Sequence, residues 1–192
     1  AMFLPLDSHD TERFLYDCRG DKRKLILAVC LQMTFPGAPS VYYGDEVGMT
    51  GANDPDCRQC MVWEKEKQDS SLFSIYQKLI HLRKQEKCIK NGGFAVNVCE
   101  GRVYGYVRYD DKNELYIILN AGKESRIVNV PVLDKKQYVD VATKQEYKVE
   151  DGDKGSWLNS DMWHYEGMVE ISLEPYSAKI LKGRPAKKDS AR

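Results

Sequence analysis

The spacing of apolar residues changes part-way along the chain. Up to about residue 92, apolar positions recur at the helical period of 3.6, and beyond it they alternate with polar positions at a period of two. The first part predicts helices over 11–17, 22–34 and 70–87 and short strands over 3–6 and 40–43. The second part predicts strands over 95–99, 103–109, 114–120, 126–130, 138–142, 146–149, 168–173 and 178–181. The pattern therefore predicts an α/β part followed by an all-β part.

The two longest predicted helices differ in how much polar surface they keep. The helix over 70–87 is amphipathic, with apolar residues at i, i+3, i+4, i+7 and i+8, namely Leu72, Ile75, Tyr76, Leu79 and Ile80. The helix over 22–34 carries a stripe made of Leu25, Ala28, Val29, Gln32 and Met33, and its other faces are also largely apolar. We therefore expect the second of these helices to be buried on most sides.

Turn-forming residues divide the chain into regions. Asn91-Gly92-Gly93 predicts a domain boundary, giving domains over 1–92 and 93–182 and a disordered tail over 183–192. Short strands joined by hairpin turns favour an antiparallel β-sandwich of about eight strands. Residues 44–61 show no periodicity, which is typical of a functional loop, and residues 152–165 form a polar loop that carries Trp157, Trp163 and His164.

Composition excludes several classes of partner. Lys+Arg and Asp+Glu each total 29 among 192 residues, so no net charge favours nucleic acid or an acidic membrane. No apolar run approaches the length of a membrane span, and no leader is recognisable. Six cysteines without a leader predict reduced thiols and a cytoplasmic protein. Cys57 and Cys60 form the one close pair, so we expect neither a metal site nor a cofactor.

Candidate chemistry begins at the segment Leu6-Asp7-Ser8-His9-Asp10-Thr11. A short apolar strand ends there at polar residues, and a helical pattern follows. His9 and Asp10 together offer an imidazole donor and a carboxylate acceptor, which suits vicinal sugar hydroxyls. The alternative interpretation is a helix-capping Asp10 beside a structural His9.

Two further stretches extend this motif. They are Gly37-Ala38-Pro39-Ser40-Val41-Tyr42-Tyr43-Gly44-Asp45-Glu46-Val47-Gly48-Met49 and Asn53-Asp54-Pro55-Asp56-Cys57-Arg58. In this order, the three stretches resemble the α-amylase superfamily of glycoside hydrolases, and most of all its cyclomaltodextrinase, neopullulanase and maltogenic amylase group. The resemblance runs from about Leu6 to Lys182. It implies the last strands and helices of a (β/α)8 barrel followed by an antiparallel β-sandwich domain.

The resemblance also implies roles for four residues. Asp10 matches the family's third carboxylate, which binds the reacting sugar and stabilises the transition state, and His9 matches the histidine beside it. Asp54 and Arg58 match a pair that hydrogen-bonds the next glucose outward. The implied partner is an α-glucan or a cyclodextrin. The alternative for Asp54 and Arg58 is a surface ion pair that braces a loop, whereas Tyr42, Tyr43 and Glu46 are expected to pack or brace.

One family feature is missing from the sequence. The nucleophile of the family lies in a Gly-x-Arg-x-Asp motif and its acid is a later Glu, both before the Ser-His-Asp element, and no Gly-x-Arg-x-Asp occurs here. We therefore expect the carboxyl-terminal part of such an enzyme, inactive alone, which forms a homo-oligomer through Leu25, Val29 and Met33 of an uncovered helix. The alternatives are a non-catalytic carbohydrate-binding or structural β-sandwich with a vestigial barrel piece, and an amylase-like scaffold that partners a transporter.

Overall fold

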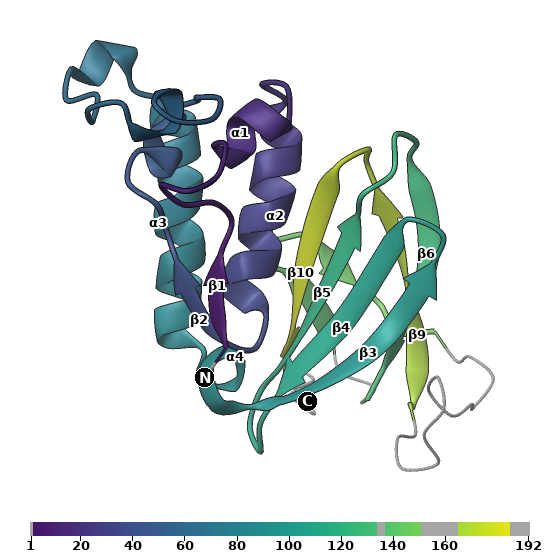
Figure 1. The fold of residues 1–192 in the computed structure, drawn as a ribbon. Helices are drawn as coiled ribbons and strands as arrows, with labels where there is room; N and C mark the ends of the chain where they lie inside the picture. The colour runs from purple at the N-terminus through teal and green to yellow at the C-terminus, as the bar shows by residue number, and fades with distance from the viewer. Residues whose placement is uncertain (1, 134–136, 151–164, 185–192) are drawn as a thin grey trace. The chain divides into compact units, whose positions relative to one another are not determined.

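The chain forms two compact units in a computed structural model that describes residues 2–133, 137–150 and 165–184 (Figure 1). The first unit comprises Ala1–Asn91 and the second Gly92–Arg192. The change of unit falls within the Asn91-Gly92-Gly93 segment, where the apolar period also changes. Each unit is described here by itself.

The first unit contains a two-stranded parallel sheet. β1 (Phe3–Pro5) pairs with β2 (Ala38–Ser40), with Phe3 opposite Ala38. Parallel neighbours need a crossover, and α2 (Lys22–Thr34) lies within it. From α2, the Gln32 amide donates to the carbonyl oxygens of Leu4, at 2.8 Å, and Ser40, at 2.9 Å. One side chain of the helix therefore binds both strands.

Two aspartates begin the longer helices of this unit. The Asp21 carboxylate caps α2 by accepting from the backbone N–H of Arg23, and Asp69 caps α3 by accepting from that of Leu72. Glu86 has extended backbone angles, so the predicted helix over 70–87 ends two residues early, at Gln85, and a short helix follows it. Besides α2, the α-helices of the first unit are α1 (Phe14–Asp17), α3 (Ser70–Gln85) and α4 (Lys87–Asn91).

The apolar stripe of α2 packs inside this unit. Leu25, Val29 and Met33 are buried in one cluster with Leu72 and Tyr76 of α3. The prediction that these three residues form an oligomer interface is therefore wrong, because α3 already covers them. The homo-oligomer itself stays a prediction.

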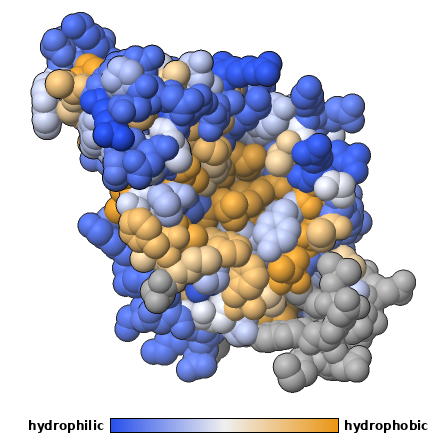
Figure 2. Space-filling view, viewed as in Figure 1, coloured by the Kyte–Doolittle hydropathy of each residue, from blue (hydrophilic) through white to orange (hydrophobic). Residues whose placement is uncertain are grey.

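Apolar surface remains exposed around the first strand. Phe3 keeps 67% of its surface accessible, and Met2 is also exposed. Figure 2 shows hydrophobic side chains gathered on the face in view over β1.

Residues 44–61 are more ordered than their lack of periodicity indicates. They contain the single-turn 3-10 helices η1 (Asp45–Val47) and η2 (Asp56–Arg58), and η3 (Lys65–Lys67) follows. Val47, Met49 and Cys57 are buried. Short helical turns give no repeating sequence signal, although they bury apolar side chains.

The second unit is built from two antiparallel sheets. The larger has the strand order β3-β4-β5-β10-β7-β8, and β6 pairs with β9 in the other. The strands are β3 (Gly93–Glu100), β4 (Val103–Tyr109), β5 (Glu114–Asn120), β6 (Arg126–Val132), β7 (Gln137–Asp140), β8 (Glu146–Tyr147), β9 (Gly167–Leu173) and β10 (Ser177–Arg184).

Alternate residues of both sheets meet in one apolar core. Val128 and Val130 of β6 and Ile171 of β9 pack with Val107 of β4 and Ile118 of β5. Val128 lies opposite Ile171 across the β6–β9 pair, so both side chains emerge on the same face.

The end of the second unit differs from the sequence prediction. β10 continues to Arg184 because residues 181–184 pair with β7, so the predicted tail does not begin at 183. Residues 185–192 and the loop residues Trp157, Trp163 and His164 lie outside the described residues. Among residues 2–133, 137–150 and 165–184, no helix combines the length and apolarity needed to cross a membrane.

Candidate functional site

The candidate site begins at the turn between β1 and α1. The hydroxyl of Ser8 accepts from the Asp10 N–H at 3.1 Å, and the Ser8 N–H donates to the Thr11 hydroxyl at 3.0 Å. These bonds close a tight polar turn in which small hydroxyl side chains replace backbone partners. The turn presents His9 and Asp10 to solvent.

The structure brings the four predicted site residues together. His9 Nε2 lies 3.4 Å from Asp10 Oδ2, and Arg58 Nη2 lies 3.6 Å from Asp10 Oδ1. Arg58 Nε lies 3.3 Å from Asp54 Oδ1. Residues 9 and 10 come from the turn after β1 and residues 54 and 58 from the segment around η2, so the cluster depends on the fold.

Arg58 connects the two segments directly. Its Nε donates to the carbonyl oxygen of His9 at 2.9 Å, and its charge faces two carboxylates. The side chains of the four residues are between 48% and 71% exposed. Arg58 thus links the turn to the segment around η2, while the cluster keeps donors and acceptors accessible to a polar ligand.

Beneath this cluster lies a buried group of charges that the sequence analysis missed. Arg13 Nη1 donates to Asp45 Oδ1 at 3.0 Å and to the carbonyl oxygen of Tyr43 at 2.8 Å. The guanidinium also lies over the rings of Tyr42, at 4.6 Å, and Tyr43, at 4.9 Å. Asp7 is buried as well, and its Oδ2 accepts from the N–H of Phe14 at 2.6 Å.

The two buried carboxyl groups interact with each other. Burial and the neighbouring Asp7 raise the pKa of Asp45 to about 8, although Arg13 opposes the rise. Removal of a carboxyl group from water disfavours its charged form, and a second carboxylate adds to that cost. Burial and the neighbouring Asp7 therefore favour the protonated form of the Asp45 carboxyl group.

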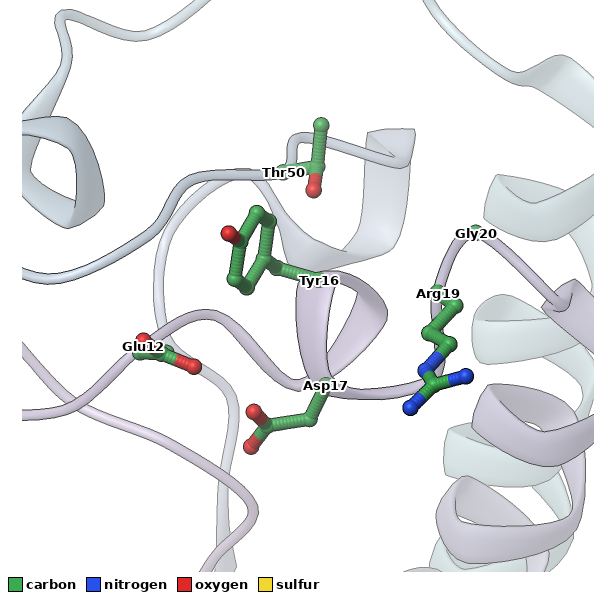
Figure 3. A pocket seen from close by; sticks show the side chains of 6 residues that line it. All are labelled: Glu12, Tyr16, Asp17, Arg19, Gly20 and Thr50. Atoms are coloured by element: carbon green, nitrogen blue, oxygen red, sulfur yellow. The ribbon is translucent and has the colours of Figure 1, made fainter.

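A surface depression adjoins the site (Figure 3). Its volume is about 570 Å³, and its lining is Glu12, Tyr16, Asp17, Arg19, Gly20 and Thr50. The carboxyl groups of Glu12 and Asp17 face each other, and a hydrogen bond between them raises the pKa of Glu12. Glu12 also accepts from the Asn53 amide at 3.0 Å.

The cysteine pair shows no arrangement for metal binding. Cys57 is buried, and its thiol donates to the carbonyl oxygen of His9 at 3.5 Å, whereas Cys60 is exposed. Within the described part of the chain, no three histidine, cysteine or acidic side chains are grouped closely enough to hold a metal ion.

Comparison with known proteins identifies the class. Residues 2–92 match the catalytic domain of the α-amylase family, and over this part the chain belongs to that family. It is 40% identical to the cyclomaltodextrinase of Thermoanaerobacter pseudethanolicus over 148 residues, which are 77% of this chain and 25% of that protein. It is 38% identical to neopullulanase 2 of Thermoactinomyces vulgaris over 180 residues, which are 92% of this chain and 28% of that protein.

Solved structures agree with the sequence relatives. A cyclomaltodextrinase structure superposes with a TM-score of 0.82 at 32% identity, and the match covers 96% of this chain and 30% of that chain. This chain is thus similar to the cyclomaltodextrinase and neopullulanase group over nearly its whole length. It spans between a quarter and a third of the length of these relatives.

Proposed function

We propose that the chain forms the carboxyl-terminal part of an α-amylase-type barrel followed by a β-sandwich domain. The parallel pair β1–β2 with the crossover helix α2 has the connectivity of consecutive strands in a (β/α)8 barrel. The turn that carries His9 and Asp10 follows the carboxyl end of β1, which is the end where such barrels place their active sites. The two antiparallel sheets of the second unit fit a sandwich.

We further propose that His9, Asp10, Asp54 and Arg58 bind an α-glucan or a cyclodextrin. The observation that carries this proposal is their convergence, because two segments more than forty residues apart contribute an imidazole, two carboxylates and a guanidinium that are linked by successive contacts of 3.3–3.6 Å. Charged planar groups of this kind hydrogen-bond adjacent hydroxyls at fixed angles. The names of the relatives support the substrate class.

We propose that Asp10 stabilises the distorted sugar ring of the transition state. Asp54 and Arg58 would hydrogen-bond the glucose unit next to the reacting one. Hydrolysis of a glycosidic bond with retention of configuration also requires a nucleophile and an acid whose carboxyl groups lie about 5–5.5 Å apart. The 192 residues contain no Gly-x-Arg-x-Asp motif. The chain by itself is therefore expected to bind the saccharide without cleaving it.

Calorimetric titration with β-cyclodextrin and maltotriose tests this function. We expect Asp10→Ala and Arg58→Met to lower the affinity by about tenfold or more, because each removes a charge-assisted hydrogen bond worth roughly 1.5–3 kcal/mol. Lys112→Ala, at an exposed position of the second unit, serves as the control and should bind like the parent chain.

A reducing-sugar assay on the same samples should detect no product. The proposal fails if the parent chain gives no binding heat at millimolar ligand. It fails equally if the parent chain cleaves the ligand and Asp10→Asn abolishes the cleavage.

A further inference from the structure

The buried charges are connected to both ends of the candidate turn. On one side, Asp7 precedes Ser8 and accepts from the Phe14 N–H. On the other, the Arg13 N–H donates to the carbonyl oxygen of Gly51 at 3.0 Å, while the Arg13 side chain contacts Asp45. Residues 8–12 thus form a loop whose two ends are fixed by buried polar bonds.

Counting donors and acceptors identifies a shared proton. Asp7 Oδ1 is buried and receives no hydrogen bond from any described N–H or O–H group. Asp7 and Asp45 share a side-chain hydrogen bond, and Oδ1 is the Asp7 oxygen that the Phe14 N–H leaves open for it. A proton on Asp45 gives that oxygen its donor, and the group then consists of one carboxylate, one guanidinium and one neutral acid, with no net charge. Without the proton, two buried carboxylates face a single cation, which is costly away from water.

We propose that Asp7, Arg13 and Asp45 are positioning residues that set the placement of His9 and Asp10, and that they do so only while one proton is shared between the two carboxyl groups. None of the three is among the proposed saccharide ligands. They act through the turn, because Asp7 and Arg13 each lie within three residues of the exposed pair. The effect on saccharide affinity rests on the proposed function, whereas the effect on the turn does not.

The residues around Asp7 and Asp45 explain why loss of the shared proton should change the structure of the nearby turn. Tyr76 of α3 interacts with Asp45, Asp7 and Glu46, and burial together with these carboxylates raises its pKa far above the usual value. Tyr42 and Tyr43 lie against Arg13. None of these tyrosine and glutamate side chains can supply positive charge at alkaline pH. Arg13 alone must therefore balance the extra negative charge. We expect the hydrogen bonds of Asp7 and Arg13, which fix the two ends of the loop, to change as a result.

Amide NMR spectra recorded from pH 5 to pH 10 test the proposal. The signals of residues 8–11 should share a transition with a midpoint near pH 8 in the parent chain. Asp45→Asn keeps the shape and the hydrogen-bonding capacity of the neutral acid, so this transition should vanish while the spectrum stays folded. Asp56→Asn, the same substitution at an exposed position of η2, should leave it unchanged.

Affinity for β-cyclodextrin supplies a second readout. It should fall at least threefold between pH 6.5 and pH 9.5 in the parent chain and in Asp56→Asn, and stay level in Asp45→Asn. The positioning proposal is overturned if the alkaline transition survives in Asp45→Asn, or if residues 8–11 show none while the chain is folded. Absence of sugar binding at both pH values, together with an intact NMR transition, would instead reject the proposed function.

Discussion

Arg13 illustrates how a charged side chain becomes part of a core. Its guanidinium is fully buried, with one nitrogen bonded to Asp45 and Tyr43 and the others lying against the rings of Tyr42 and Tyr43. Aromatic faces compensate for the missing acceptors of Nε and Nη2. Removal of Arg13 leaves a buried carboxylate without a cation beside it, which is expensive away from water. The group therefore fixes the geometry of its neighbours more than it adds stability.

Stability should depend on pH through Asp45. Its pKa rises from the usual 3.8 to about 8 on folding, so the folded state holds a proton that the unfolded chain releases between these values. The free energy of unfolding should fall as pH rises from about 4 to about 8, by at most about 1.4 kcal/mol per pH unit, and then level off. Urea unfolding at several pH values measures this slope.

Asp45→Asn should remove most of that slope. The matched variant Asp56→Asn should retain it. Equal slopes in Asp45→Asn and the parent chain would show that Asp45 has an ordinary pKa in the folded protein.

Among the elements, α2 and α3 are joined where both begin. Asp69 caps α3 through Leu72 N–H, accepts from the Ser71 hydroxyl at 2.6 Å and pairs with Lys22 of α2 at 2.5 Å. The Lys22 ammonium group, followed by these two donors, holds the pKa of Asp69 well below its usual value. One carboxylate thus orients two helices that share a core.

Asp69→Ala should lower the free energy of unfolding by about 1–2 kcal/mol, since it removes a cap and an ion pair together. Lys22→Ala should cost less, because its ammonium group is more than half exposed and solvent screens the pair. Glu66→Ala, at an exposed position just before α3, is the control for chemical denaturation. Equal midpoints for Asp69→Ala and Glu66→Ala would contradict the capping role.

The sequence predicted most elements where the apolar period was regular. The alternation over 168–173 and the helical spacing from Leu72 to Ile80 correctly predicted β9 and α3. Errors occurred where a side chain stops an element. The strand predicted over 138–142 ends at Asp140, because its carboxylate accepts from the N–H groups of Ala142 and Thr143 and turns the chain.

The sequence predicted the exposed residues of the candidate site but not the buried charged residues near them. Resemblance supplied His9, Asp10, Asp54 and Arg58, and the structure places them together. The buried charges could not be found from the sequence, because Arg13 and Asp45 stand in polar stretches that look like surface. Their burial comes from tertiary contacts between segments thirty residues apart, which carry no periodic signal.

In the whole molecule, the proposed saccharide ligands all lie in the first unit. The second unit has an antiparallel apolar core of its own. The rival hypothesis of a carbohydrate-binding β-sandwich places the ligand in the second unit. Locating the bound saccharide therefore decides between the two.

Chemical-shift mapping with β-cyclodextrin on the full chain is the most direct measurement. The account predicts that amide signals of residues 8–11 and 53–58 move in a saturable way, while the ligand's own spectrum shows no conversion to linear sugars. Shifts confined to residues 92–184, no saturable shift at all, or steady appearance of cleaved ligand would contradict it.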